Sequence, residues 1–247
     1  MSDKFQTYQG ALGDSGLMQL DQLQFDETFI AVIQRVYLWM TLGLLITSGA
    51  AYLTASTVLS QIIFSTPYLY LGLMMGELIL VIVLSAAINR LNPAVATMMF
   101  FIYAVLNGMT LSAIFLVYEL GSIFIAFLIT ACLFGSMTII GYSTKKNLNN
   151  WGGYLVMALI GMVITSVVNI FIGSGPLDWI ISFVMVFIFL GLTIYDTQRI
   201  KKMIAFSLQQ GETAIISRVG LMGALSLYLD FINLFLQILR LFGRRRR

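Results

Sequence analysis

Residues 219–241 read VGLMGALSLYLDFINLFLQILRL and place a polar stripe on an apolar segment that is long enough to cross a membrane. The stripe consists of Gly223, Ser226, Asp230, Asn233, Gln237 and Arg240. These residues follow one another at steps of three or four, so they share one face of a helix. Since polar groups along a whole span cannot face lipid, the helix is expected to be surrounded by protein or to line a water-filled path. The alternative is a polar seam that only holds helices together.

The rest of the chain is as apolar as this segment. Of the 247 residues, 59% are hydrophobic and 10% are charged, whereas soluble domains average roughly 45–50% apolar and about 25% charged residues. The apolar runs are too long for barrel strands and lack alternation. We therefore predict an all-α membrane protein with seven transmembrane helices in one domain, residues 28–242. The predicted spans are residues 29–55, 68–88, 94–117, 122–142, 152–172, 178–198 and 219–241.

The charges outside the spans predict the orientation. Lysines and arginines occur in the gaps after spans two, four and six and not after spans one, three and five. This bias places the N-terminus and the even-numbered loops in the cytoplasm. Residues 1–27 are acidic and are expected to form a disordered cytoplasmic tail, and residues 243–247 form a basic tail. The length of the last segment favours a full crossing, while its basic end favours re-entry on the cytoplasmic side; we predict crossing.

Two absences exclude much catalytic chemistry. The chain has no histidine and a single cysteine, Cys132. Triads that use histidine, His-ligated metals, internal disulfides and thiolate clusters are therefore excluded. Nucleic-acid binding is not expected, because the net charge of +3 comes largely from the loops and the basic tail. Without histidine, a response to pH near neutrality would most simply use carboxyl groups.

Placing an acidic residue inside a membrane span costs free energy, so acidic residues in the predicted spans indicate functional sites. Glu77 lies in span two, Asp196 near the end of span six and Asp230 in span seven. Asp196 alone has an ordinary interpretation as an interfacial carboxylate capped by Arg199. Because the last two spans are joined by one loop, however, Asp196 and Asp230 are expected to meet and to share a proton. A cation or Arg90, at the end of span two, is the alternative means of compensating their charge.

Amide and hydroxyl side chains extend this polar set. Tyr103, Asn107 and Thr110 share one face of span three. Carboxylate, amide and hydroxyl oxygens are ligands that calcium favours. This chemistry is compatible with calcium at Asp196 and Asp230 but does not identify the ion. Arg90, Glu77, Asn107, Asn233 and Ser226 are the candidates for a latch or an ion path.

Three motifs carry a resemblance to a known family. They are NGMTLS at residues 107–112, YDTQ at residues 195–198 and LSLYLDFINLF at residues 225–235. Together they resemble the Bax inhibitor-1 family of membrane proteins, in particular its bacterial branch, and the likeness extends over residues 29–243. The resemblance implies seven spans, with the seventh helix central among the other six. It also implies a multi-pass protein of the cell inner (plasma) membrane.

The resemblance further implies a pH-sensitive calcium leak channel. Asp196 and Asp230 match the aspartate pair that gates such channels, hydrogen-bonded in the closed state and opened by changes in protonation. Glu77 matches the acidic residue of span two. Arg90 is the nearest match to an arginine that contacts the pair, although it lies about two residues further along. Calcium is then the transported or bound ion, and no resident cofactor is expected.

Two other functions remain open from the sequence. One is a non-transporting regulator that binds a membrane protease or another membrane protein, with residues 1–27 as the docking segment. The other is an intramembrane aspartyl protease, whose first motif Tyr195-Asp196 fits. Its second motif does not fit, because Asp230 follows Leu-Tyr-Leu rather than Gly-x-Gly, and no Pro-Ala-Leu follows. We therefore expect no enzymatic activity.

Overall fold

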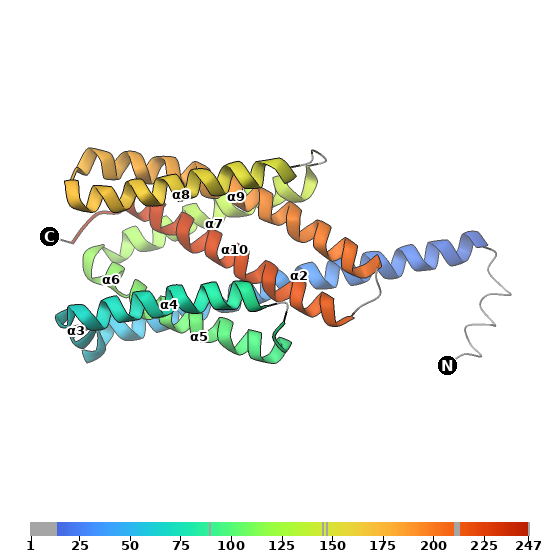
Figure 1. Cartoon of the computed structure of the whole chain (residues 1–247), viewed down its shortest axis with the longest axis horizontal. Coiled ribbons are helices and arrows are strands. Elements are labelled where there is room, and N and C mark those ends of the chain that lie inside the picture. Colours follow the sequence, from blue (N-terminus) through green and yellow to red (C-terminus); the bar gives the residue numbers. More distant parts are fainter. Residues whose placement is uncertain (1–13, 89, 145, 147, 210–212, 247) are drawn as a thin grey trace.

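The computed structural model describes residues 14–88, 90–144, 146, 148–209 and 213–246, and these residues are almost entirely helical (Figure 1). The helices are α2 (Asp14–Ser56), α3 (Val58–Ser65), α4 (Pro67–Ala87), α5 (Pro93–Leu111), α6 (Ala113–Val117), α7 (Leu120–Ser143), α8 (Asn149–Ile172), α9 (Gly175–Gln209) and α10 (Thr213–Phe242). Within the described residues, seven spans are long and apolar enough to cross a membrane. The all-α, seven-span prediction is confirmed.

The span limits agree with the prediction to within a few residues, except where helices run on or break. Span six, which belongs to α9, reaches Ser207 instead of residue 198. Span three breaks at Ser112 into α5 and α6. The predicted disordered tail is wrong for residues 14–27, which are the first part of α2; residues 1–13 lie outside the described residues. Extending an existing helix fixes one residue per hydrogen bond, so a polar flank readily continues a helix that the span has nucleated.

Turn residues fix where the helices begin and end. Pro67 and Pro93 occupy the first turns of α4 and α5, where a missing N–H group is tolerated. The Asn92 side chain accepts a hydrogen bond from the Ala94 N–H group at 3.0 Å and caps α5. At the other end of the bundle α8 stops at Gly173, whose φ of 68° is left-handed.

The seventh span, α10, lies at the centre of the bundle (Figure 1). Of its apolar window, 67% is buried, whereas no other span exceeds 39%. It packs most extensively against α9 and also against α2, α7 and α5, while α4 packs mainly on α5 and α8 on α9. The helix crosses the full length of the bundle (Figure 1), so the re-entrant alternative does not hold. Within its polar stripe Gly223, Asp230 and Gln237 are buried, Ser226 and Asn233 are partly buried and Arg240 is exposed.

Tyr228 joins three helices at this centre. Its side chain is fully buried, and its hydroxyl lies 2.7 Å from Thr47 Oγ1 on α2 and donates to Asn107 Oδ1 on α5 at 3.1 Å. Thr47 Oγ1 also donates to the Ala104 carbonyl at 3.0 Å. The Phe100 ring packs edge-on against Tyr228. This buried cluster sets how α2 and α5 lie against α10.

Replacing Tyr228 with phenylalanine tests that cluster. Tyr228→Phe keeps the ring but leaves the buried Asn107 amide without its hydroxyl donor, which is expected to cost about 1–3 kcal/mol. The midpoint of thermal unfolding in detergent should therefore fall. Tyr68→Phe is the control, since Tyr68 is 86% exposed. Equal unfolding midpoints for the two variants would mean that the hydroxyl contributes nothing.

Candidate functional site

The structure brings Asp196 and Asp230 together on neighbouring antiparallel helices. Asp230 projects from the middle of α10 and is only 5% exposed, while Asp196 is half-buried in α9. The two carboxyl groups are close enough to interact electrostatically. Asp230 Oδ2 is buried and has no hydrogen-bond partner among the described residues. Burying a carboxyl oxygen without a hydrogen-bond donor costs free energy, so this group needs a proton, a water molecule or a cation beside it.

Neighbours of Asp196 fix the rotation of α9. The Tyr195 ring packs so closely on α8 that a Cβ atom at Gly152 would overlap it. On another side, Gln198 Nε2 donates to the Lys146 carbonyl at 2.6 Å, which ties α9 to the turn between α7 and α8. With these two side chains held, Asp196 is directed towards α10.

The cation beside the pair is Arg199, which interacts electrostatically with Asp196. Arg199 is exposed and lies one turn further along α9. Arg90, the residue proposed as a latch, is also exposed and follows the end of α4. Asp196 therefore interacts with Arg199, as the interfacial interpretation predicts, and also with Asp230.

A second polar region faces α4 and α5. A cavity of about 480 Å³ lies between α4, α5 and α10. Its polar lining residues are Tyr70, Glu77, Tyr103, Asn107, Thr110, Tyr118, Asn233 and Arg240. Glu77 is half-buried and its Oε2 accepts a hydrogen bond from Thr110 Oγ1 at 2.9 Å. The cavity extends from the middle of α4 to Tyr118 and Arg240, near the end of the bundle where the chain ends.

The polar residues of the α10 stripe therefore lie in two different surroundings. Asn233 and Arg240 line the cavity, whereas Asp230 and Ser226 do not. Asn233 Nδ2 also donates to the Leu229 carbonyl of its own helix at 2.8 Å. Asn107 lines the cavity and accepts the hydrogen bond from Tyr228, so it connects the cavity to the buried cluster.

Sequence reasoning missed Tyr228 and Thr47. Tyr228 lies two residues before Asp230, roughly 200° away around the helix, and therefore falls outside the stripe. Thr47 is one of several scattered hydroxyl residues of its span, which also contains Thr41, Ser48 and Thr54. The one available signal was the polar face of span three, because a buried Asn107 requires a partner from another helix.

The described side chains do not form a closed set of ligands around a metal ion. Within the described residues no group of three or more histidine, cysteine, aspartate or glutamate side chains could hold a metal ion. Calcium takes six to eight oxygen ligands. At the aspartate pair, an ion would therefore need most of its ligands from water or from backbone and amide oxygens.

Comparisons with known proteins agree with the resemblance in the motifs. Residues 30–247 match the family described as "Inhibitor of apoptosis-promoting Bax1". The chain is 45% identical over 221 residues to the inner membrane protein YbhL of Escherichia coli K12, covering 89% of this chain and 93% of the relative. An uncharacterized protein of Deinococcus radiodurans is 42% identical over 226 residues, 92% of this chain and 93% of its own length. The chain is a multi-pass, seven-span membrane protein and belongs to the Bax inhibitor-1 family.

Proposed function

We propose that this protein is a pH-sensitive leak channel for calcium in which Asp196 and Asp230 form the gate. The observation that carries the proposal is the Asp230 carboxyl: it is buried at the centre of the bundle, one of its oxygens has no partner among the described residues, and a second carboxyl is in electrostatic range. Ionisable groups inside membrane spans are rare, and they mark ion pathways and proton relays.

In this proposal, repulsion between the two carboxylates opens the channel. Two adjacent carboxylates in a poorly solvated site cannot both be ionised cheaply, so the pair shares one proton. The shared proton holds α9 against α10 and keeps the path closed. Removing that proton adds repulsion between the two helices and favours opening. Protonating both groups leaves a poor site for a cation.

The cavity beside α4 is proposed as the other half of the path. Glu77 supplies a negative charge about halfway along α4, and Asn107, Thr110 and Asn233 supply neutral oxygens beside it. These are suitable ligands for a partly hydrated calcium ion. The Tyr228 cluster borders this cavity, since Asn107 belongs to both the cluster and the cavity lining.

The orientation decides which compartment controls the gate. Arg90 follows the end of α4, Lys146 lies between α7 and α8, and Lys201 lies in the last part of α9. These parts of the chain lie at the end of the bundle where the chain begins (Figure 1), and we propose that this end faces the cytoplasm. The aspartate pair then responds to cytoplasmic pH. The E. coli relative is named an inner membrane protein, and this name supports the proposal that the chain lies in the inner membrane.

Calcium flux into proteoliposomes that contain only this protein tests the gate. Wild-type flux should rise as the pH is increased through neutrality, because deprotonation opens the pair. Asp196→Asn and Asp230→Asn should each remove this pH dependence, since neither variant retains two carboxyl groups. Asp178→Asn is the matched control: it alters a carboxylate at the opposite end of α9 and should keep the wild-type pH profile.

Three outcomes would contradict the gate. A wild-type pH profile in both variants would remove the pair from the mechanism. An equal loss in Asp178→Asn would show a general electrostatic effect. No flux from the wild-type protein at any pH would favour the non-transporting regulator instead.

Glu77→Gln tests the cavity separately from the gate. Replacing its carboxyl group with an amide should lower calcium flux about tenfold, the equivalent of about 1.4 kcal/mol, while the pH-dependent opening that depends on the intact aspartate pair remains. Glu119→Gln is the control, since Glu119 is exposed in the turn before α7. Flux through both variants is measured at several calcium concentrations. Undiminished flux in Glu77→Gln would exclude the cavity from the ion path.

A further inference from the structure

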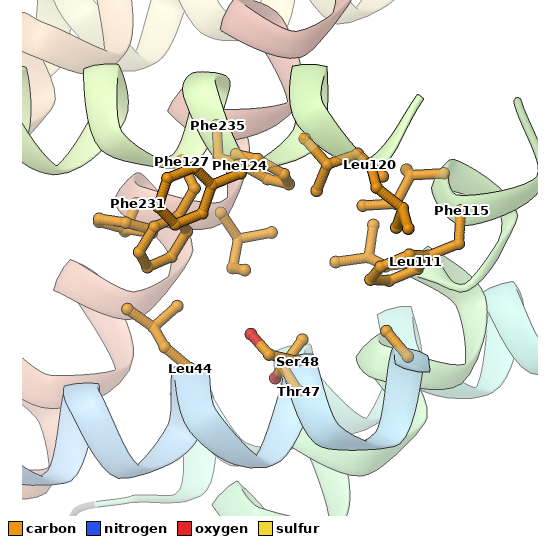
Figure 2. A pocket seen from close by; sticks show the side chains of 14 residues that line it. Leu44, Thr47, Ser48, Leu111, Phe115, Leu120, Phe124, Phe127, Phe231 and Phe235 are labelled. Carbon is orange, nitrogen blue, oxygen red and sulfur yellow. The ribbon is translucent and has the colours of Figure 1, made fainter. Parts of the chain in front are cut away.

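A second, almost entirely apolar pocket lies on another side of α10. It has a volume of about 370 Å³ and lies between α2 and α7, with α10 and α6 completing its wall. Figure 2 shows Leu44 and Ser48 of α2 facing Phe124 and Phe127 of α7 across the open space. Except for Thr47 and Ser48, all lining residues are apolar.

Helix packing explains why the space is left open. Both α2 and α7 pack against α10, and both also contact the short helix α6. The break at Ser112 separates α6 from α5 and brings Phe115 of α6 into the pocket wall. Since α10 and α6 hold the two spans apart, the side chains between them do not fill the gap.

The pocket lies within the membrane-spanning part of the bundle and borders the lipid. Its α2 residues, 44–51, are in the last part of the span Glu27–Ser56, and its α7 residues, 120–127, begin the span Leu120–Ser143. It therefore occupies the half of the bundle where the chain ends. Phe124, a wall residue, is 63% exposed.

The basic tail is anchored beside this pocket. The Glu119 N–H group donates to the Arg244 carbonyl at 3.0 Å, and the Arg246 N–H group donates to the Val117 carbonyl at 2.8 Å. Arg246 Nη1 also donates to the carbonyl of Phe115, which lines the pocket, at 3.2 Å. Backbone and side chain together hold the tail on the turn between α6 and α7.

Fixed positive charge therefore lies next to an apolar pocket at the membrane surface. Arg244, Arg245 and Arg246 are all exposed, and Glu119 contributes one negative charge beside them. Arginine binds phosphate groups with two parallel hydrogen bonds and is the residue best suited to them. The apolar pocket matches the acyl chain of a phospholipid, and the adjacent arginines match its phosphate headgroup.

We propose that this pocket holds one acyl chain of an anionic phospholipid, whose headgroup is bound by Arg244 and Arg246. The chain fills a space in which the wall side chains otherwise lack packing partners. The arginines select the headgroup, since they gain more from a net negative lipid than from a zwitterionic one. The bound lipid links α2, α7 and the basic tail.

Native mass spectrometry measures the headgroup selectivity. The purified protein is mixed with phosphatidylglycerol or with phosphatidylcholine of identical acyl chains. We expect several-fold higher occupancy by phosphatidylglycerol in the wild type. The double variant Arg244→Gln/Arg246→Gln should lose this preference, and Arg244→Lys/Arg246→Lys should keep most of it. The control Arg35→Gln/Lys146→Gln removes the same charge from two exposed residues away from the tail and should bind like the wild type.

Filling the pocket tests the acyl-chain site. Ser48→Trp places a large side chain into the space from an exposed position and should lower the occupancy of both lipids several-fold. Ser136→Trp makes the same change at an exposed position of α7 away from the pocket and should leave the occupancy unchanged. Size-exclusion profiles that match the wild type establish that both variants are folded.

Photocrosslinking provides a test without substitutions. Phosphatidylglycerol with a diazirine in its acyl chain should label residues 44–51 and 120–127 in preference to the exposed surface of α8. Equal occupancy by the two lipids in the wild type would overturn the headgroup site. Equal effects of the two tryptophan variants, or crosslinks spread evenly over the spans, would overturn the pocket.

Discussion

A carboxyl group in the middle of a membrane helix must be enclosed by protein, because neither lipid nor an isolated helix can stabilise it. Asp230 imposes this requirement on α10. The structure meets it by surrounding α10 with α9, α2, α7 and α5 and leaving α4 and α8 as outer helices. The most polar span is consequently the most buried, which is the reverse of the arrangement in a soluble bundle.

Enclosure of α10 creates two chemically distinct faces on one helix. Towards α9, Asp230 meets Asp196, and the two carboxyl groups interact electrostatically. Towards α4 and α5, Asn233 and Arg240 face a cavity that contains the Glu77 carboxyl. Tyr228 holds α2 and α5 against α10 beside this cavity.

Hydropathy and helical periodicity predicted the spans and the enclosure of α10, because both follow from the chemistry of lipid. They did not predict the helix at residues 14–27, whose polar composition resembles that of a tail, or the break at Ser112, which depends on the packing of α6. The sequence also left two cations open as partners of Asp196, because Arg90 and Arg199 both lie near the same membrane surface and helix rotation decides between them. The partners of Tyr228 likewise depend on side-chain contacts between distant segments.

Crosslinking between the last two spans tests the central claim most directly. In a Cys132→Ala background, Asp196→Cys/Asp230→Cys is treated in membranes with a short reagent that joins two thiols, and the link is identified by mass spectrometry. An intramolecular link in this variant, with none in Asp178→Cys/Asp230→Cys, is the predicted result. Failure of the 196–230 pair to link, or equal linking in both variants, would contradict a gate made of two adjacent carboxyl groups.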